Sequence, residues 1–252
     1  MREPEVTCFL IHHSGGSAAS FSPLIPHLPV KWRSLAVDLP GRGGSAEPPA
    51  DRSIAELVDR LAPAVLAQGT GRIAVFGHSL GALVAYELVR ELERSEVGPV
   101  WLGVSGSPAP QLVAQRRLER RDLWSRERLL AFLRELGGTP EEMLAMPDVV
   151  DYMVEVLRSD LYAVDTYEHV DGPPLRTPIS VYSGTADPLA GVELLGGWRE
   201  RSRSAVNIRS WPGGHFYLFE QSKIFTENLV ADVCSAMPGA PQAVREMKGV
   251  EL

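Results

Sequence analysis

Residues 73–83 read IAVFGHSLGAL, and this stretch carries most of the fold prediction. Its first four residues are apolar and predict a buried strand, while the residues from Leu80 onward predict a helix. Between the two lies a G-x-S-x-G motif centred on Ser79. A serine on such a sharp strand-to-helix turn needs flanking residues without side chains, which Gly77 and Gly81 provide. The stretch therefore predicts a serine hydroxyl held clear of a sheet, at the start of a helix.

Short apolar runs alternate with longer helical patterns along the rest of the chain. Strands are predicted at Thr7–Ile11, Leu35–Val37, Ile73–Phe76, Val100–Val104, Ile179–Tyr182 and Asn207–Trp211, and clear helices at Ser53–Gln68 and Leu80–Arg94. Apolar strands separated by helices indicate a mostly parallel central sheet that is flanked by helices on both faces. We therefore predict an α/β fold in a single domain spanning residues 1–252.

The segment at about 111–170 breaks this alternation, because it has helical patterns and no convincing strand. Its predicted helices cover Ser125–Leu136 and about Val149–Glu168, with a capping box and an N-terminal proline at Thr139–Glu142 between them. Ligands in open α/β folds bind at the carboxyl edge of the sheet. We therefore interpret this segment as a helical insertion that forms a lid over that edge.

A base and an acid are needed beside the serine, and they follow it in the chain in this kind of fold. His215 comes after the last predicted strand on a Gly-Gly loop and is the predicted base. Asp187, in the turn after the strand at 179–182, is the predicted acid that orients it. Asp165 and Asp171 are alternatives that precede that strand. The other histidines are His12, His13, His27, His78 and His169, which lie too early, beside the serine or in the helical insertion.

Two backbone N–H groups are expected to bind the negative charge that develops on the substrate oxygen. Leu80, directly after the serine, supplies one of them. Ser14 supplies the other, since it precedes a glycine pair in the loop after the first strand. A plain glycine turn is the alternative interpretation of that loop.

Taken together, these segments resemble the stand-alone type II thioesterases that accompany polyketide and nonribosomal peptide synthetases. The resemblance spans nearly the whole chain. It rests on GGSAASF at 15–21, DLPGRG at 38–43, GHSLGA at 77–82, SGSPAP at 105–110, LGGTPEE at 136–142, LRSD at 157–160 and GGHFYL at 213–218. Two positions differ from the family pattern: His12-His13-Ser14 stands where Pro-Tyr-Ala is usual, and Ser107 stands where a basic residue is frequent.

The resemblance implies an α/β-hydrolase that removes aberrant or stalled acyl groups from the phosphopantetheine arm of an acyl or peptidyl carrier protein. The reaction would use an acyl-serine intermediate and needs no cofactor or metal. The apolar face of the helical insertion is expected to line the acyl pocket, although helical spacing alone also fits a purely structural core. The candidate lining residues are Leu129, Phe132, Leu133, Met153 and Leu157.

Three other functions share parts of this pattern. A general carboxylesterase would use the same three side chains. A chain-releasing thioesterase is not favoured, since the sequence starts at Met1 without a carrier-like segment before it. A non-catalytic binding protein would be expected to lack one member of the triad, yet Ser79, Asp187 and His215 are all present.

The charge and composition of the chain exclude some classes of binding partner. The 252 residues carry a formal net charge of −7 and a pI near 5.4, which argues against nucleic acid or an anionic membrane. No apolar stretch reaches membrane-spanning length and no signal pattern precedes the first strand, so a cytoplasmic location is expected. Cys8 and Cys234 are predicted to be buried free thiols.

Four arginines within six residues stand out from this acidic background: Arg116, Arg117, Arg120 and Arg121. They are predicted to form a basic surface that meets an acidic carrier protein. A solvated helix face is the alternative interpretation.

Overall fold

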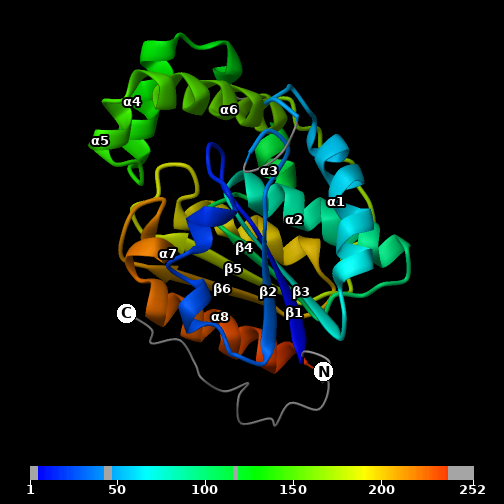
Figure 1. Cartoon of the computed structure of the whole chain (residues 1–252). Helices are drawn as coiled ribbons and strands as arrows, with labels where there is room; N and C mark the ends of the chain where they lie inside the picture. Colours follow the sequence, from blue (N-terminus) through cyan, green and yellow to red (C-terminus); the bar gives the residue numbers. More distant parts are fainter. Residues whose placement is uncertain (1–4, 43–46, 116–118, 238–252) are drawn as a thin grey trace.

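A six-stranded parallel sheet forms the centre of the computed structural model, which describes residues 5–42, 47–115 and 119–237 (Figure 1). The strands are β1 (Val6–Ile11), β2 (Trp32–Val37), β3 (Arg72–His78), β4 (Trp101–Ser105), β5 (Ile179–Gly184) and β6 (Val206–Trp211). The helices are α1 (Ile54–Gln68), α2 (Leu80–Arg94), α3 (Pro110–Gln115), α4 (Arg126–Leu136), α5 (Glu141–Leu144), α6 (Pro147–Asp165), α7 (Tyr217–Glu220) and α8 (Ser222–Ala236). Short 3-10 helices are η1 (Ala18–Phe21), η2 (Ile25–His27), η3 (Arg121–Leu123) and η4 (Val192–Arg201). The strand order is β2-β1-β3-β4-β5-β6.

The six predicted strands are all present, with ends that differ from the prediction by three residues or fewer. The largest difference is at β2, which starts at Trp32 because its backbone pairs with β1 from Val6 onward. Helix α1 starts one residue later than predicted, since Ser53 is its N-cap and forms a capping box with Glu56. Helix α2 has the predicted bounds.

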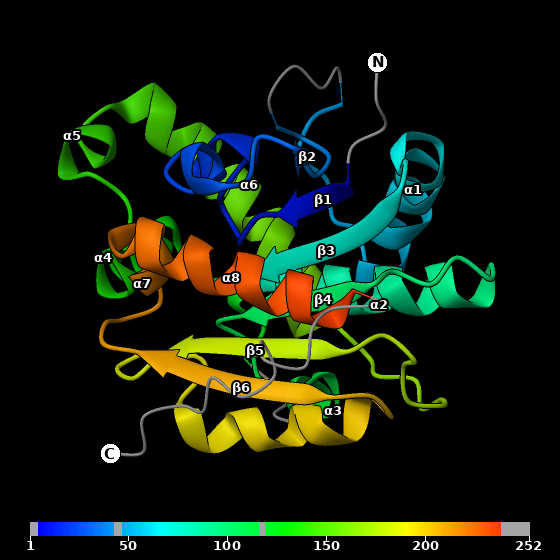
Figure 2. The same ribbon diagram turned by 90° about the horizontal axis from the view of Figure 1, so that it is seen from below.

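Two apolar cores cover the two faces of the sheet. Alternate residues of each strand point to opposite faces, so in β1 Phe9 packs into one core and Leu10 into the other. The first core joins the sheet to α1, α2 and η4, and the second joins it to η1, α7 and α8. The views in Figures 1 and 2 show α8 on the side of the sheet opposite to α1 and α2. The sheet is therefore covered on both faces, as predicted.

The order in which successive strands are added to the sheet changes side at β1. Strand β2 pairs with one edge of β1 and β3 with the other, so the loops after β1 and β3 leave the sheet side by side. Their ends are in register, because Ile11 pairs with Gly77. Such a switch point is where open α/β sheets bind their ligands. We call residues 12–17, which follow β1, the β1 loop.

Glycines allow α2 to start directly against these strand ends. A Cβ added to Gly81 would lie 2.1 Å from the carbonyl oxygen of Ile11, and one added to Gly77 would lie 1.9 Å from that of Gly81. Neither position tolerates a side chain at such distances. The two glycines of the G-x-S-x-G motif are therefore needed for close packing of backbone on backbone.

The helical insertion lies between β4 and β5 and comprises α3, η3, α4, α5 and α6. Its helices lie above the carboxyl ends of the strands in Figure 1. Helices α4, α5 and α6 have a small apolar core of their own. The predicted capping box is wrong: α5 starts at Glu141 with Pro140 as its N-cap, and no side chain caps it, because Thr139 faces the pocket described below.

Two further predictions concern thiols and membranes. Cys8 is fully buried, and burial raises the pKa of its thiol to about 12, whereas Cys234 is only half-buried, against prediction. Cys234 lies near the end of α8, where the helix meets solvent. In the part of the chain that the structure describes, no helix is long and apolar enough to cross a membrane.

Candidate active site

Ser79 occupies a strained turn between β3 and α2. Its φ of 58° and ψ of −117° are values that a residue with a side chain rarely adopts. The turn is held in place because the Ser79 N–H donates a hydrogen bond of 2.7 Å to the carbonyl oxygen of Ser105, at the end of β4. The side chain faces a pocket at the N-terminus of α2. The positive end of the helix dipole therefore points at this pocket.

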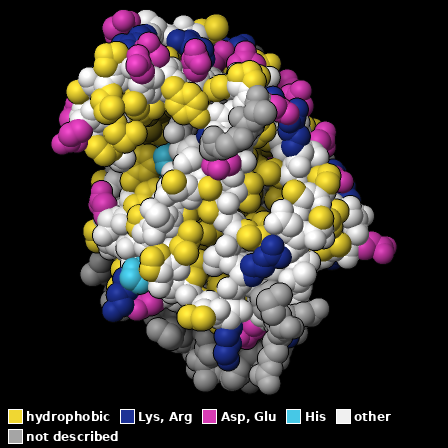
Figure 3. Space-filling model, viewed as in Figure 1, with side chains coloured by type: hydrophobic (Ala, Val, Ile, Leu, Met, Phe, Trp, Pro, Cys, Tyr) yellow, Lys and Arg dark blue, Asp and Glu magenta, His cyan; other side chains and the backbone are white. Residues whose placement is uncertain are grey.

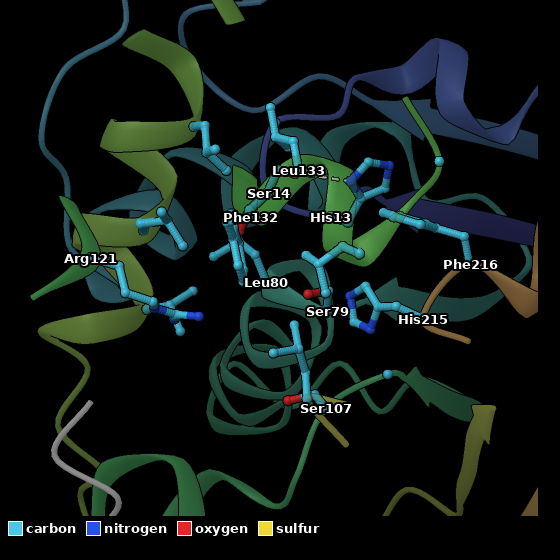
Figure 4. A pocket seen from close by; sticks show the side chains of 18 of the residues that line it. His13, Ser14, Ser79, Leu80, Ser107, Arg121, Phe132, Leu133, His215 and Phe216 are labelled. Carbon is cyan, nitrogen blue, oxygen red and sulfur yellow. Dashed lines mark hydrogen bonds between the residues drawn. The ribbon is translucent and has the colours of Figure 1, made fainter. Parts of the chain in front are cut away.

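His215 and Asp187 come from the loops after β6 and β5. Their side chains are buried, and His215 Nδ1 lies 2.9 Å from Asp187 Oδ2. The other carboxylate oxygen accepts hydrogen bonds from the N–H groups of Leu189 (2.9 Å) and Ala190 (3.3 Å), which fix its orientation. Because a carboxylate only accepts, His215 Nδ1 carries the hydrogen, and Nε2 is left as the basic nitrogen. Figure 4 shows the His215 ring beside Ser79.

The pKa of Asp187 is lowered in this setting. Burial opposes ionisation, but the hydrogen bond to His215, the charge of that ring and the two backbone N–H groups outweigh it. The carboxylate is therefore ionised at neutral pH. The competing aspartates lie elsewhere, since Asp165 pairs with Arg121 and Asp171 approaches His169.

Two backbone N–H groups also border the pocket. Leu80 and Ser14 both line it, from the start of α2 and from the β1 loop. Neither N–H donates a hydrogen bond to another group within the described residues. Unpaired donors at a helix N-terminus and an adjacent loop are the arrangement that binds an oxyanion.

The far wall of the pocket is apolar and belongs to the helical insertion. Figure 3 shows hydrophobic side chains gathered on the insertion beside a hollow in the surface. Of the predicted lining residues, four lie in the wall: Phe132, Leu133, Met153 and Leu157. Leu129 does not line the pocket, because it is fully buried in the core between α4 and α6. Helical spacing could not distinguish these two environments on one helix.

The predicted arginine surface is wrong at Arg121, whereas Arg120 is exposed as the prediction requires. Arg121 is buried, and its Nη2 lies 2.5 Å from Oδ1 of Asp165 on α6, so its charge is neutralised within the pocket wall (Figure 4). Arg120 is exposed and pairs with Asp122 at 2.7 Å. Arg116 and Arg117 lie outside the described residues.

Aromatic rings surround His215, and no sequence pattern indicated a role for them. The His78 ring lies 4.8 Å from that of His215 and the His13 ring lies 4.8 Å from that of Phe216, measured between centroids. His13 and Phe216 also line the pocket. Burial, followed by the neighbouring His215 and His13, holds the pKa of His78 well below its usual value. A neutral His78 adds no charge that would oppose protonation of His215.

The described residues contain no candidate metal-binding cluster. No group of three or more His, Cys, Asp or Glu side chains there is arranged to hold a metal ion. What the arrangement provides is a hydroxyl, an imidazole fixed by a carboxylate, two free N–H groups and an apolar wall. These are the parts needed for acyl transfer to serine.

Comparisons with known proteins agree with this chemistry. The thioesterase domain model matches residues 6–233. Thioesterase PikA5 of Streptomyces venezuelae is 36% identical, over 92% of this chain and 82% of its own. The type II thioesterase BorB of the borrelidin cluster is 32% identical with a TM-score of 0.83, over 90% of this chain and 92% of its own. YbtT, a type II thioesterase of the yersiniabactin NRPS/PKS pathway, is 27% identical with a TM-score of 0.80, over 92% and 94%.

The family match covers both the sheet and the helical insertion. It confirms the resemblance predicted from the sequence, including the α/β-hydrolase fold. The chain belongs to the thioesterase family, as a hydrolase of thioesters related to the type II enzymes of polyketide and nonribosomal peptide pathways.

Proposed function

We propose that this thioesterase removes acyl groups from the phosphopantetheine arm of a carrier protein, with Ser79 as nucleophile, His215 as base and Asp187 as the acid that orients it. The observation that carries the proposal is the 2.9 Å contact between His215 and Asp187 beside Ser79. It fixes the tautomer in which Nε2 is free to take the serine proton.

The reaction follows from these positions. His215 Nε2 takes the proton as Ser79 Oγ attacks the thioester carbonyl, and the N–H groups of Leu80 and Ser14 bind the oxyanion. Collapse of the tetrahedral intermediate breaks the C–S bond, and His215 returns the proton to the departing thiolate. A water molecule, deprotonated by His215, then attacks the acyl-serine, and the carboxylic acid and free Ser79 are released.

The pocket supports an acyl substrate. Its wall in the helical insertion is built largely from Phe132, Leu133, Leu136, Met153, Leu157 and Leu161, which would desolvate an alkyl chain bound to Ser79. A pocket that selects by apolar contact discriminates weakly between similar chains, by about 1–3 kcal/mol per methylene. Weak discrimination suits an editing enzyme that clears several kinds of stalled acyl group from a carrier.

The same triad would hydrolyse a simple ester, so a general carboxylesterase is the second candidate. The two functions differ in leaving group and in the macromolecular partner. A carrier-bound substrate gains binding energy from the carrier, which an ester of a small alcohol cannot supply.

Hydrolysis of acyl groups loaded on a purified carrier protein tests the proposal, with the mass of the intact carrier as the readout. We expect conversion to the free phosphopantetheinyl form with wild-type enzyme and none with Ser79→Ala. The value of kcat/KM should be higher for the acyl carrier than for an alkyl ester of the same acid. A preference for the ester would identify a carboxylesterase, and an active Ser79→Ala variant would exclude Ser79 as the nucleophile.

A further inference from the structure

A buried ion pair connects the helical insertion to the β1 loop. Asp160 lies on α6 and Arg42 in the loop after β2, and their side chains are only 3% and 4% exposed. Arg42 Nη2 donates to Asp160 Oδ2, and the same oxygen accepts the N–H of Gly15 at 2.7 Å. One carboxylate therefore holds together three segments that are distant in the sequence.

Arg42 extends the connection along the β1 loop. Its Nε donates to the carbonyl oxygen of Gly16 at 3.1 Å, and its Nη1 donates to that of Pro40 at 2.9 Å. Gly15 and Gly16 directly follow Ser14, whose N–H borders the pocket. Asp160 therefore binds the N–H of Gly15 and Arg42 binds the carbonyl oxygen of Gly16, immediately after the Ser14 N–H that is assigned to the oxyanion hole.

The hydrogen bond to Asp160 fixes the direction of the Gly15 N–H. Gly15 has a φ of 75°, which favours glycine, and its N–H is directed at Asp160 on α6. If Asp160 were absent, that N–H would lose its acceptor in a buried position, and the loop would be free to turn toward water. Burial raises the pKa of Asp160, while Arg42 and the Gly15 N–H oppose that rise, so its negative charge depends on these two partners.

We propose that Asp160 and Arg42 are positioning residues for the oxyanion hole: they orient the Ser14 N–H through Gly15 and Gly16, and they make that orientation depend on the seating of α6. This inference rests on the proposed function, because it assigns the Ser14 N–H to the oxyanion. Its consequence is that the hydrolytic site is complete only when the helical insertion is docked. Acyl transfer to Ser79 is thereby linked to closure of the pocket around the substrate.

The test uses a short acyl-pantetheine, because a short chain makes little use of the insertion's apolar wall. Asp160→Ala should lower kcat by about 100-fold, similar to loss of one oxyanion donor, with KM changed by less than about threefold. Asp160→Asn keeps an oxygen that can accept the Gly15 N–H, and should lose only about tenfold. The affinity for an alkylboronic acid, which forms a tetrahedral adduct with serine, should fall in parallel with kcat.

Two variants separate positioning from stability. Replacing both charges, in Arg42→Met with Asp160→Leu, removes the unpaired buried charge and should allow folding, yet kcat should stay low because Gly15 still lacks its acceptor. Asp151→Asn is the matched control: Asp151 is on the same helix and pairs with Arg126 at 2.8 Å, but this pair is exposed, and Asp151 forms no hydrogen bond to the β1 loop among the described residues. It should leave kcat unchanged.

Folded Asp160→Ala and double variants that keep wild-type kcat and boronate affinity would overturn the inference. A higher KM with an unchanged kcat would also overturn it, since α6 would then shape the pocket without orienting the oxyanion hole. Failure of the proposed function has a different signature: Ser79→Ala would remain active, whatever the Asp160 variants do.

Discussion

The carboxyl edge of the sheet and the helical insertion face each other across the pocket, and they are held in different ways. At the sheet edge the backbone fixes the reactive groups: Ser79 follows β3 and bonds to the end of β4, while His215 and Asp187 leave adjacent strands β6 and β5. The insertion is held by side chains, through its own apolar core and buried pairs such as Arg121 with Asp165. In the proposed mechanism, the reactive groups are therefore positioned by backbone at the sheet edge, and the acyl wall is formed by side chains of the insertion.

The largest effect should come from Ser79, the proposed nucleophile. Ser79→Ala is expected to lower kcat by about 10⁶-fold, because members of a triad act as a unit. Its fold should persist, since Ser79 contributes little apolar surface. Circular dichroism and a thioester assay on the same sample check both expectations.

A second replacement at this position measures the strain stored at the sheet edge. Ser79→Gly should be equally inactive but more stable than Ser79→Ala by about 1 kcal/mol, because glycine accepts the φ of 58° without steric cost. Denaturant unfolding gives the difference. Equal stabilities would mean that the turn holds no side-chain strain.

Asp187→Asn should cost somewhat less, on the order of 10⁴ in kcat, the effect seen when an amide imposes the wrong tautomer on the base of a related triad. The matched variant on the other side of the pocket is Asp165→Asn. It breaks the buried pair with Arg121, so it should lower the free energy of unfolding by about 3 kcal/mol and leave the turnover of folded enzyme within about tenfold. A larger loss of turnover in Asp165→Asn than in Asp187→Asn would reverse these roles.

The contrast between the two regions also explains what the sequence could predict. Strands and the loops that follow them carry local patterns. These patterns, together with chain order, predicted that Ser79, Asp187 and His215 lie at the sheet edge. The need for glycine at Gly77 and Gly81 was also predicted from the local motif. In the structure, a Cβ added at either position would clash with backbone atoms.

The sequence of the insertion has no local pattern that tells which of its residues face the pocket. Its helices were predicted from periodicity, but periodicity does not tell which side of an apolar helix meets a pocket and which meets a second helix. Leu129 and Leu133 lie one turn apart on α4, and only Leu133 reaches the pocket. Arg121 was misplaced for a related reason: its partner, Asp165, is 44 residues away. Asp160 and Gly15 are 145 residues apart, and no local signal joins them.

Those two leucines offer the next test. Leu133→Phe enlarges a side chain in the pocket wall, and should lower kcat/KM for long acyl chains relative to short ones by about tenfold. Leu129→Ala leaves a cavity in the insertion's core and should lower the free energy of unfolding by about 2–5 kcal/mol without shifting the chain-length profile. A panel of acyl-pantetheines of increasing length gives the profile. An unchanged profile in Leu133→Phe would place the acyl chain elsewhere.

The smallest expected effect concerns the groups that the sheet edge buries. His78 is fully buried and neutral, with Nδ1 3.0 Å from Ser105 Oγ, and burial first of all lowers its pKa far below 6.5. The unfolded chain binds a proton at this residue below about pH 6.5 and the folded chain does not, so stability must fall as the pH decreases from there. The slope that one such histidine adds is at most about 1.4 kcal/mol per pH unit.

His78→Asn keeps a donor near Nδ1 but cannot take up the proton, and should reduce the slope of unfolding free energy between about pH 6 and 5 by about 1 kcal/mol per unit. His27→Asn, at an exposed position, should leave the slope as it is in the wild type. If both variants keep the wild-type slope, His78 is not a source of the fold's acid sensitivity, and His12 and His13, whose pKa values are also lowered by burial, become the next residues to test.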